Sequence, residues 1–265
     1  MDLGLENRMV LITGGSVGIG LAVAEEFLKE KAGVIICARD GGRIEKVTGE
    51  LRAKYPGSKI YGKSCDVSKP ADLESLAAYV KELGGVDILI NNAGTGSEEK
   101  SMTAPDEKWY YYWDLHVMAA IRLSRMLVPM MKERPGEGVI INTTSMCATQ
   151  PLSYEPIYNT TKAALNMYTK CLAEELIGDN IRALAIAPGL VLTPDWYKTA
   201  GILSEKEGIT VQQYFDNIAR AMTPIGRFAT PEETAKLYVF LASKQASYCL
   251  GTSFHIDAGA VKTLV

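Results

Sequence analysis

Residues 9–20 read Met9-Val10-Leu11-Ile12-Thr13-Gly14-Gly15-Ser16-Val17-Gly18-Ile19-Gly20. The apolar run up to Thr13 is typical of a buried strand, and a helical pattern follows the last glycine. Glycines at such a junction let the backbone approach a pyrophosphate, which the free N–H groups and dipole of a helix N-terminus hold. The spacing is Gly-x-x-x-Gly-x-Gly, not the Gly-x-Gly-x-x-Gly of the usual fingerprint. We therefore expect a dinucleotide-binding turn, with a purely structural tight turn as the alternative.

Strand and helix patterns alternate along the rest of the chain. This alternation, with several continuously apolar strands, predicts one α/β domain over residues 1–265. Its core would be a Rossmann-type, doubly wound, seven-stranded parallel sheet flanked by helices on both faces. The expected strands are Met9–Thr13, Gly33–Cys37, Lys59–Lys63, Asp87–Asn91, Gly138–Thr143, Ile181–Ala187 and Thr252–Ile256. The expected helices lie near 18–31, 44–55, 70–83, 107–133, 157–177 and 230–242.

One long segment, residues 194–224, fits no regular element. It lies before the last helix, which begins with a capping box formed by Thr230 and Glu233. A loop of this length in a compact domain is usually functional, often a lid over an active site. We expect a substrate lid, with a pair of short surface helices of no special role as the alternative.

Composition sets limits on the partners. The net charge of −3 gives no reason to expect nucleic acid or an anionic membrane. The five cysteines are scattered without a Cys-x-x-Cys pair, so we expect reduced thiols, no metal site and a cytoplasmic protein. The start of the chain lacks a signal-peptide pattern, and the apolar helix Val117–Met131 contains Arg122 and Arg125 and is too short for a membrane span.

A tyrosine and a lysine share one face of the helix expected at 157–177. Tyr158 and Lys162 lie four residues apart, and Ser145 stands thirteen residues before Tyr158. A nearby ammonium favours the phenolate, so Lys162 is expected to lower the pKa of Tyr158 from its usual value near ~10. A second Tyr-x-x-x-Lys, from Tyr55 to Lys59, encloses Pro56 and Gly57 and is interpreted as a helix-ending turn.

The end of the second strand is expected to meet the adenosine ribose of a dinucleotide. An acid there favours NAD, whereas an arginine pairs with the 2′-phosphate of NADP. The chain reads Cys37-Ala38-Arg39-Asp40. Arg39 favours NADP(H). NAD(H) remains possible if Asp40 turns inward, and Arg39 could also be a solvated surface charge.

Two further strand ends carry candidate cofactor contacts. Asp66 begins an Asp-Val-Ser turn after the third strand and could accept from the adenine amino group, or it could cap the next helix. Asn91-Asn92-Ala93-Gly94 ends the fourth strand, where small residues would let the chain pass close to the cofactor. A simple turn at a strand end is the alternative.

Taken together, these motifs closely resemble the short-chain dehydrogenase/reductase family in its small single-domain form, over essentially the whole chain. The resemblance rests on the glycines of residues 14–20, Asp66, residues 91–94, Ser145, Tyr158 with Lys162, and Pro188-Gly189 followed by Thr193. The cofactor-binding residues that it implies are Gly14, Ser16, Gly18, Ile19, Gly20, Arg39, Asp66, Val67, Asn92, Ala93, Gly94, Tyr158, Lys162, Pro188, Gly189, Val191 and Thr193.

The resemblance also implies catalytic roles. Tyr158 would exchange a proton with the substrate oxygen, and Lys162 would lower its pKa and bind the nicotinamide ribose. Ser145 would stabilise the substrate oxygen, and residues 188–193 would hold the carboxamide. Family members usually carry asparagine where this chain has His116, and that asparagine helps hold a proton-relaying water. His116 is therefore expected either to relay protons near neutral pH or to be a buried structural histidine.

A second, milder departure lies near the C-terminus. Residues 257–259 read Asp257-Ala258-Gly259, where the family usually has Asp-Gly-Gly. This change puts only the local turn geometry in doubt.

The expected activity is NADP(H)-dependent interconversion of a secondary alcohol and a ketone, with no metal. Enoyl reduction would need a tyrosine seven positions before a lysine, but the residue seven after Tyr158 is Leu165 and the residue seven after Tyr154 is Thr161. Sugar-nucleotide epimerases usually carry a larger C-terminal domain. The alternative from another class is a catalytically silent dinucleotide-binding or redox-sensing module.

The substrate and the assembly are less defined. Trp109, residues 110–113, Tyr154 and Trp196 are candidates for an apolar substrate site. The aromatic run could equally pack against another subunit. Because family members are commonly tetramers or dimers joined through the fourth and fifth helices, a homo-oligomer, such as a homotetramer, is expected.

Overall fold

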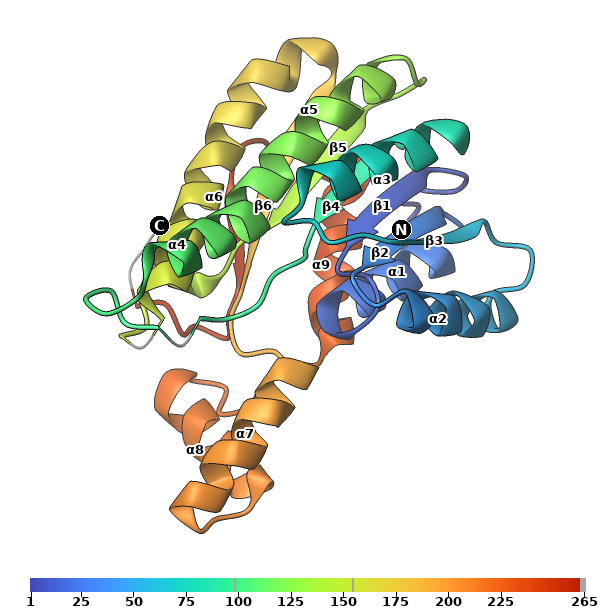
Figure 1. Cartoon of the computed structure of the whole chain (residues 1–265). Coiled ribbons are helices and arrows are strands. Elements are labelled where there is room, and N and C mark those ends of the chain that lie inside the picture. Colours follow the sequence, from blue (N-terminus) through green and yellow to red (C-terminus); the bar gives the residue numbers. More distant parts are fainter. Residues whose placement is uncertain (98, 154, 263–265) are drawn as a thin grey trace.

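The structure is a computed structural model and describes residues 1–97, 99–153 and 155–262 (Figure 1). Seven strands form one sheet in the order β3-β2-β1-β4-β5-β6-β7, and every neighbouring pair is parallel. The strands are β1 Met9–Thr13, β2 Gly33–Ala38, β3 Ile60–Ser64, β4 Ile88–Asn91, β5 Gly138–Thr143, β6 Ile181–Pro188 and β7 Ser253–Ile256. The predicted Rossmann-type, doubly wound α/β sheet is confirmed, with boundaries shifted by one residue at most.

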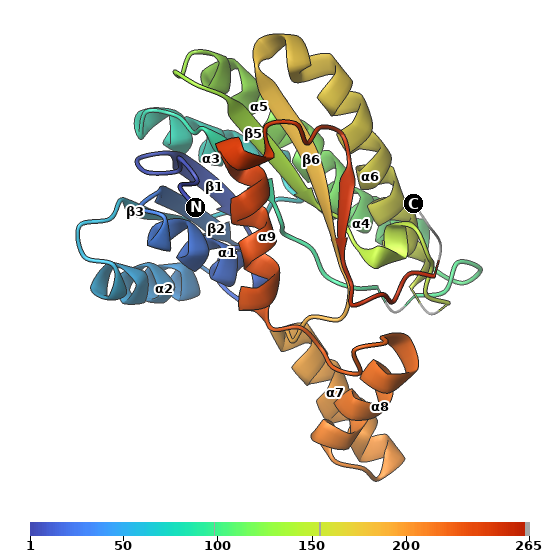
Figure 2. The same ribbon diagram turned by 180° about the vertical axis from the view of Figure 1, so that it is seen from behind.

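Helices cover both faces of this sheet. They are α1 Gly18–Lys29, α2 Gly41–Lys54, α3 Pro70–Glu82, α4 Asp106–Trp113, α5 Ala119–Lys132, α6 Pro156–Leu176, α7 Pro194–Glu207, α8 Val211–Met222 and α9 Pro231–Ala242. One buried core joins the sheet to α1, α2 and α9, and a second joins it to α3, α5 and α6. Figures 1 and 2 show these two layers from opposite sides.

Alternation along the strands explains the two cores. Val10 and Ile12 of β1 contribute to the first core, and Leu11 between them contributes to the second. Successive side chains of a strand point to opposite faces, so a strand covered on both sides must be apolar throughout. All five residues of β1 are buried, as expected for a strand in the middle of the sheet.

The helix expected over 107–133 is not one continuous α-helix. The α-helical segments α4 and α5 are separated by a π-helical turn, Asp114–Met118, that contains His116. A π-helical turn adds a residue to the helix and is frequently found at functional sites. Within the residues that the structure describes, no helix is long and apolar enough to cross a membrane.

Residues 194–224 are largely helical, so the expectation of an irregular segment was wrong. α7 begins at Pro194, a residue suited to the first turn, and ends before Gly208 in the left-handed conformation. Thr210 and Gln213 then form a capping box that starts α8. Both helices project from the body beyond the end of β6 (Figures 1 and 2). Short helices do not contradict a lid, and that role stays a prediction.

Candidate active site

The glycine turn after β1 has the geometry of an anion-binding turn. Gly14 and Gly18 adopt φ values of +66° and +55°, which favour glycine. A Cβ on Gly20 would lie 2.3 Å from the carbonyl oxygen of Gly14, so the turn and the helix touch too closely for any side chain. α1 begins after Val17 without a side-chain cap, which leaves N–H groups of its first turn available to a ligand.

Thr13 ties the glycine turn to the segment after β4. Its Oγ1 accepts from the backbone N–H groups of Asn92 and Ala93 at 2.9 and 3.0 Å. In return, Asn92 Nδ2 donates to the carbonyl oxygen of Thr13 at 3.0 Å. Two of the sequence-predicted cofactor segments are therefore joined at the carboxyl edge of the sheet, where ligands bind in open α/β sheets.

Just after β2, Asp40 pairs with Arg43, whereas Arg39 has a different partner. Asp40 caps α2 by accepting from the backbone N–H of Arg43 at 3.0 Å, and its carboxylate pairs with the Arg43 side chain at 3.6 Å. The alternative in which Asp40 turns inward is therefore not what the structure shows. Arg39 is exposed and donates to the hydroxyl of Tyr111 at 3.3 Å. Sequence reasoning did not consider Arg43, a second cation close to the end of β2. Its position three residues after Asp40, a residue type that often caps a helix, was a usable signal.

Asp66 forms a turn rather than a helix cap. Its Oδ1 accepts from the backbone N–H and the hydroxyl of Ser68 at 3.1 and 2.7 Å. The N-cap of α3 is Lys69, so the capping alternative for Asp66 is wrong. Val67, the next residue, is buried beside this turn.

The predicted catalytic side chains converge at the carboxyl ends of β5 and the N-terminal turns of α6. Ser145 is buried and caps the short helix Met146–Ala148. Lys162 donates to the carbonyl oxygen of Thr143 at 2.8 Å, and its Nζ lies 5.5 Å from the centre of the Tyr158 ring. Ser145 and Tyr158 are hydrogen-bonded through their side chains.

Burial dominates the acid–base properties of this group. It raises the pKa of Tyr158 above 10, helped by nearby Cys147 and Glu155 and opposed by the hydrogen bond to Ser145. Burial also lowers the pKa of Lys162 to about 8. The expected lowering of the Tyr158 pKa is therefore wrong for the ligand-free chain, because desolvation of the phenolate outweighs the ammonium beside it.

His116 lies in the interior next to the same group. Its ring is 5.4 Å from the Tyr158 ring in an edge-on arrangement, and its Nδ1 lies 2.9 Å from Thr161 Oγ1. Its Nε2 accepts from the backbone N–H of Thr95 at 3.4 Å. Burial, followed by the charge of Lys162, lowers the His116 pKa well below 6.5. The imidazole is thus neutral at physiological pH, which contradicts the alternative that it relays protons by titrating near pH 7 and agrees with the alternative of a buried histidine.

Several residues around the group were not found by sequence reasoning. Thr95 and Thr161 hold the imidazole, and Cys147 donates its backbone N–H to Ser145 Oγ at 3.2 Å. Glu155 caps α6 through its backbone only, and a Cβ on Gly96 would lie 2.5 Å from its Oε1. The one usable signal was position, since Glu155 and Thr161 lie three residues to either side of Tyr158.

Residues 188–193 follow β6 toward α7. Gly189 packs so closely on Asp257 that a Cβ would lie 2.7 Å from the Asp257 Cα, and Val191 forms a bridge with Ala229. Thr193 is the N-cap of α7 without a side-chain bond to the helix, so its hydroxyl is available to a ligand. Ala258 adopts φ +57°, the conformation that glycine would take more easily at this departure from the family pattern.

The aromatic candidates separate into two groups. Trp196 and Tyr158 pack against one apolar cluster, which joins Met146 and Cys147 to α7 and α8. Trp109, Tyr111 and Tyr112 belong to the core under α5, while Tyr110 and Trp113 are exposed. Within the run 110–113, Tyr112 packs against the His116 ring with the ring centres 5.7 Å apart, and the role of the run in a substrate site stays a prediction. Tyr154 lies outside the residues that the structure describes.

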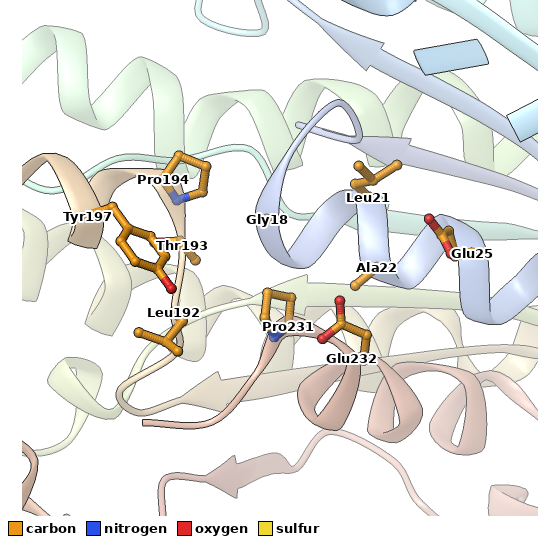
Figure 3. Close-up of a pocket in the computed structure, with 10 residues that line it drawn as sticks. All are labelled: Gly18, Leu21, Ala22, Glu25, Leu192, Thr193, Pro194, Tyr197, Pro231 and Glu232. Atoms are coloured by element: carbon orange, nitrogen blue, oxygen red, sulfur yellow. The ribbon is translucent and has the colours of Figure 1, made fainter. Parts of the chain in front are cut away.

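A cavity of about 230 Å³ lies beside the glycine turn, where α1, α7 and α9 begin (Figure 3). Gly18, Thr193, Tyr197 and Pro231 are among its lining residues. Ser145, Tyr158 and Lys162 are not part of its wall. The cavity therefore adjoins the predicted cofactor segments and the base of α7 rather than the predicted catalytic side chains.

Comparisons with known proteins agree with this fold. A family model described as enoyl-(acyl carrier protein) reductase matches residues 14–261. A 3alpha-hydroxysteroid dehydrogenase from Mediterraneibacter gnavus is 34% identical and covers 98% of this chain, which spans 99% of that protein. The chain belongs to the short-chain dehydrogenase/reductase family of oxidoreductases.

Two solved structures are similar along nearly the whole length. The L-sorbose reductase from Gluconobacter frateurii, solved with NADPH and L-sorbose, is 49% identical with a TM-score of 0.97, and the match covers 100% of both chains. An NADPH-bound short chain oxidoreductase from Pseudomonas aeruginosa PAO1 with an atypical catalytic center is 29% identical with a TM-score of 0.89, over 97% of this chain and 98% of that one.

Proposed function

We propose that this protein reduces a ketone to a secondary alcohol with NADPH. The observation that carries the proposal is the convergence of Ser145, Tyr158 and Lys162. Lys162 Nζ donates a hydrogen bond to the Thr143 carbonyl oxygen at 2.8 Å and lies 5.5 Å from the centre of the Tyr158 ring. A catalytically silent module would have no need for a buried lysine whose pKa is lowered to about 8.

The chain's own residues fit a phosphorylated dinucleotide. The glycine turn has no room for a Cβ at Gly20, and α1 has no side-chain cap. Arg39 is free of any acidic partner among the described residues, whereas Asp40 is engaged with Arg43. Two similar structures were solved with NADPH. When bound, NADPH supplies the hydride, and the protein supplies binding, orientation and the proton.

Protonation favours the reductive direction. Because the pKa of Tyr158 lies above 10, its phenol carries the proton at neutral pH and can donate it from Oη to the ketone oxygen. The Ser145 hydroxyl stabilises the same oxygen as negative charge develops. Lys162 is mainly an ammonium below pH 8 and stabilises the phenolate left behind.

Two carboxylates near the catalytic side chains favour a neutral, hydroxyl-rich ketone. Glu155 lies beside Tyr158 and the segment after β4, and Asp195 of α7 accepts from the hydroxyl of Thr95, in that same segment, at 3.2 Å. Carboxylates accept hydrogen bonds from hydroxyls and repel anionic substrates. The 49% identity to an L-sorbose reductase supports a ketose as the first substrate to test.

We also propose that α7 and α8 act as the substrate lid. They are joined to the body at residues 191–193 and 226–230, and their apolar side includes Tyr214 and Phe215. The same cluster includes Met146 and Cys147 next to Ser145. A helical pair that shares its packing with the catalytic segment can close over a bound substrate.

Enoyl reduction, the activity in the description of the matching family model, has weaker support. The residue seven positions before Lys162 is Glu155, not a tyrosine. The relatives named above include a hydroxysteroid dehydrogenase and a ketose reductase, both of which act on alcohol or ketone carbons.

The test is NADPH and NADH oxidation by the purified protein with ketohexoses including L-sorbose, with 3-oxobutanoate, and with a 2-enoyl thioester. The proposal expects turnover with at least one neutral ketose and a preference for NADPH. Activity confined to the enoyl thioester, or no oxidation with any of these carbonyl compounds despite NADPH binding, would overturn it.

A further inference from the structure

Arg39 is joined to a residue far away in the sequence. Its Nη1 donates to the hydroxyl of Tyr111 at 3.3 Å, although 72 positions separate the two. Arg39 follows β2, and Tyr111 belongs to α4. The backbone of Arg39 is also anchored, because Ser64 Oγ donates to its carbonyl oxygen at 3.0 Å. A residue of β3 thus holds the backbone of Arg39, and a residue of α4 holds its side chain.

Tyr111 is suited to hold a flexible side chain. Its ring packs partly buried against the core under α5, and its centre lies 5.2 Å from the centre of the Tyr112 ring, so these contacts restrain the ring that carries the hydroxyl. Its neighbour Tyr110 is 68% exposed. An arginine side chain loses much rotamer freedom when it is fixed, and a preorganised guanidinium binds an anion more tightly because that loss has already occurred.

We propose that Tyr111 is a positioning residue for Arg39 and thereby increases the preference for a 2′-phosphorylated adenosine. The proposal rests on the proposed NADPH dependence. Tyr111 holds the guanidinium through its hydroxyl at the carboxyl end of β2, where the adenosine ribose is expected. The neutral phenol leaves the full charge of Arg39 for the phosphate, whereas a carboxylate in its place would compete with the phosphate.

The test uses two halves of the cofactor, 2′,5′-ADP and 5′-AMP, measured by titration calorimetry. Tyr111→Phe removes only the hydroxyl, and we expect it to weaken 2′,5′-ADP about fivefold and to leave 5′-AMP within twofold. Tyr110→Phe is the matched control, which should change neither affinity. In an Arg39→Ala background, Tyr111→Phe should have no further effect on 2′,5′-ADP, as expected for residues that act as one unit.

The outcomes separate this proposal from the one on which it rests. If Arg39→Ala leaves the affinity for 2′,5′-ADP unchanged, the assignment of NADPH through Arg39 fails. If Arg39→Ala weakens it but Tyr111→Phe does not, only the role of Tyr111 fails. Equal weakening of both nucleotides by Tyr111→Phe, or an undiminished effect without Arg39, would also overturn the positioning role. Thermal unfolding of each variant identifies any that fail to fold, and Tyr111→Leu, which also lacks a hydrogen-bond acceptor, then replaces Tyr111→Phe.

Discussion

His116 Nδ1 and Thr161 Oγ1 lie 2.9 Å apart in the interior, and this contact is one link of a longer chain of hydrogen bonds. The Thr95 N–H donates to His116 Nε2, which therefore carries the lone pair, and the ring proton lies on Nδ1. Nδ1–H then donates to Thr161, whose hydroxyl donates to the Tyr158 carbonyl oxygen at 3.0 Å. The imidazole thus connects the segment after β4 to the helix that carries Tyr158 and Lys162.

This network predicts how His116 substitutions behave. His116→Asn keeps a polar side chain and should retain activity within about fivefold. His116→Leu should lose about a hundredfold, because it leaves the Thr95 N–H and the Thr161 hydroxyl without their partner in the interior. Because burial holds the His116 pKa well below 6.5, the parent pH–rate profile should show no histidine inflection near pH 7. An inflection between pH 6 and 7 that disappears in His116→Asn would contradict this expectation and support proton relay by a titrating His116. Equal rates for the parent, Asn and Leu enzymes would leave His116 with a purely structural role.

Tyr158→Phe should abolish turnover while leaving NADPH binding within a few-fold. The variant loses only the hydroxyl that transfers the proton, a contribution of about 10²–10⁴ in rate. Ketone reduction and fluorescence titration with NADPH measure the two properties separately. A variant that kept most of the parent rate would exclude Tyr158 as the proton donor.

Lys162 should make the stability of the ligand-free protein depend on pH. Its folded-state pKa of about 8 lies below the ordinary 10.5, so between these values the unfolded chain binds more protons. The buried ammonium lowers the free energy of unfolding by its full amount below pH 8, and this destabilisation is relieved as the pH rises toward 10.5. Lys162→Met should therefore be more stable than the parent by about 1–3 kcal/mol at pH 7, with a difference that shrinks at higher pH.

Urea unfolding of Lys162→Met and the parent at pH 7, 8.5 and 10 tests this. The other titrating groups are common to both proteins and largely cancel in the difference. A difference independent of pH would show that the ammonium is not desolvated. The variant should also be inactive, which would make Lys162 a residue that lowers stability in exchange for catalysis.

Local patterns were sufficient to predict much of the fold and the approach of Tyr158 to Lys162. The glycines of the turn are required by close backbone contacts, so their spacing alone predicts the turn. Tyr158 and Lys162 lie four residues apart on a helix, and this spacing alone predicts that they are neighbours. Contacts between distant segments have no such pattern, which is why the links from Arg39 to Tyr111 and from His116 to Thr161 were not expected. The direction of the Tyr158 pKa was wrong for a related reason, because sequence shows the neighbouring charge but not the burial.

Arg39→Asp should shift the cofactor preference from NADPH toward NADH. The substitution replaces the partner of the 2′-phosphate with a carboxylate that repels it, while a carboxylate can accept from the two ribose hydroxyls of NADH. The ratio of kcat/KM for the two cofactors should fall at least about tenfold. Arg43→Asp is a useful comparison, because Arg43 already pairs with Asp40. An unchanged ratio for Arg39→Asp would show that Arg39 does not face the 2′-phosphate.

The charge of Glu155 should decide between neutral and anionic ketones. Glu155 lies close enough to Tyr158 and Cys147 for its charge to raise the pKa of both, so a substrate at Tyr158 experiences the same field. Glu155→Gln keeps the shape of the side chain and removes the charge. We expect the KM for a neutral ketose to rise about tenfold, because a charge-assisted hydrogen bond from a substrate hydroxyl is weakened. The KM for 3-oxobutanoate should fall, because the repulsion of its carboxylate is removed.

Glu232→Gln is the matched control for this prediction. It makes the same change in net charge on the first turn of α9, in the wall of the cavity beside the glycine turn (Figure 3). Ser145, Tyr158 and Lys162 are not part of that wall. Its KM values for both ketones should equal those of the parent. Steady-state kinetics with the two substrates at saturating NADPH give the comparison. Because the two changes in KM for Glu155→Gln have opposite signs, a general loss of folding cannot imitate them. If Glu155→Gln changed both KM values in the same direction, or matched Glu232→Gln, the carboxylate would not select the substrate.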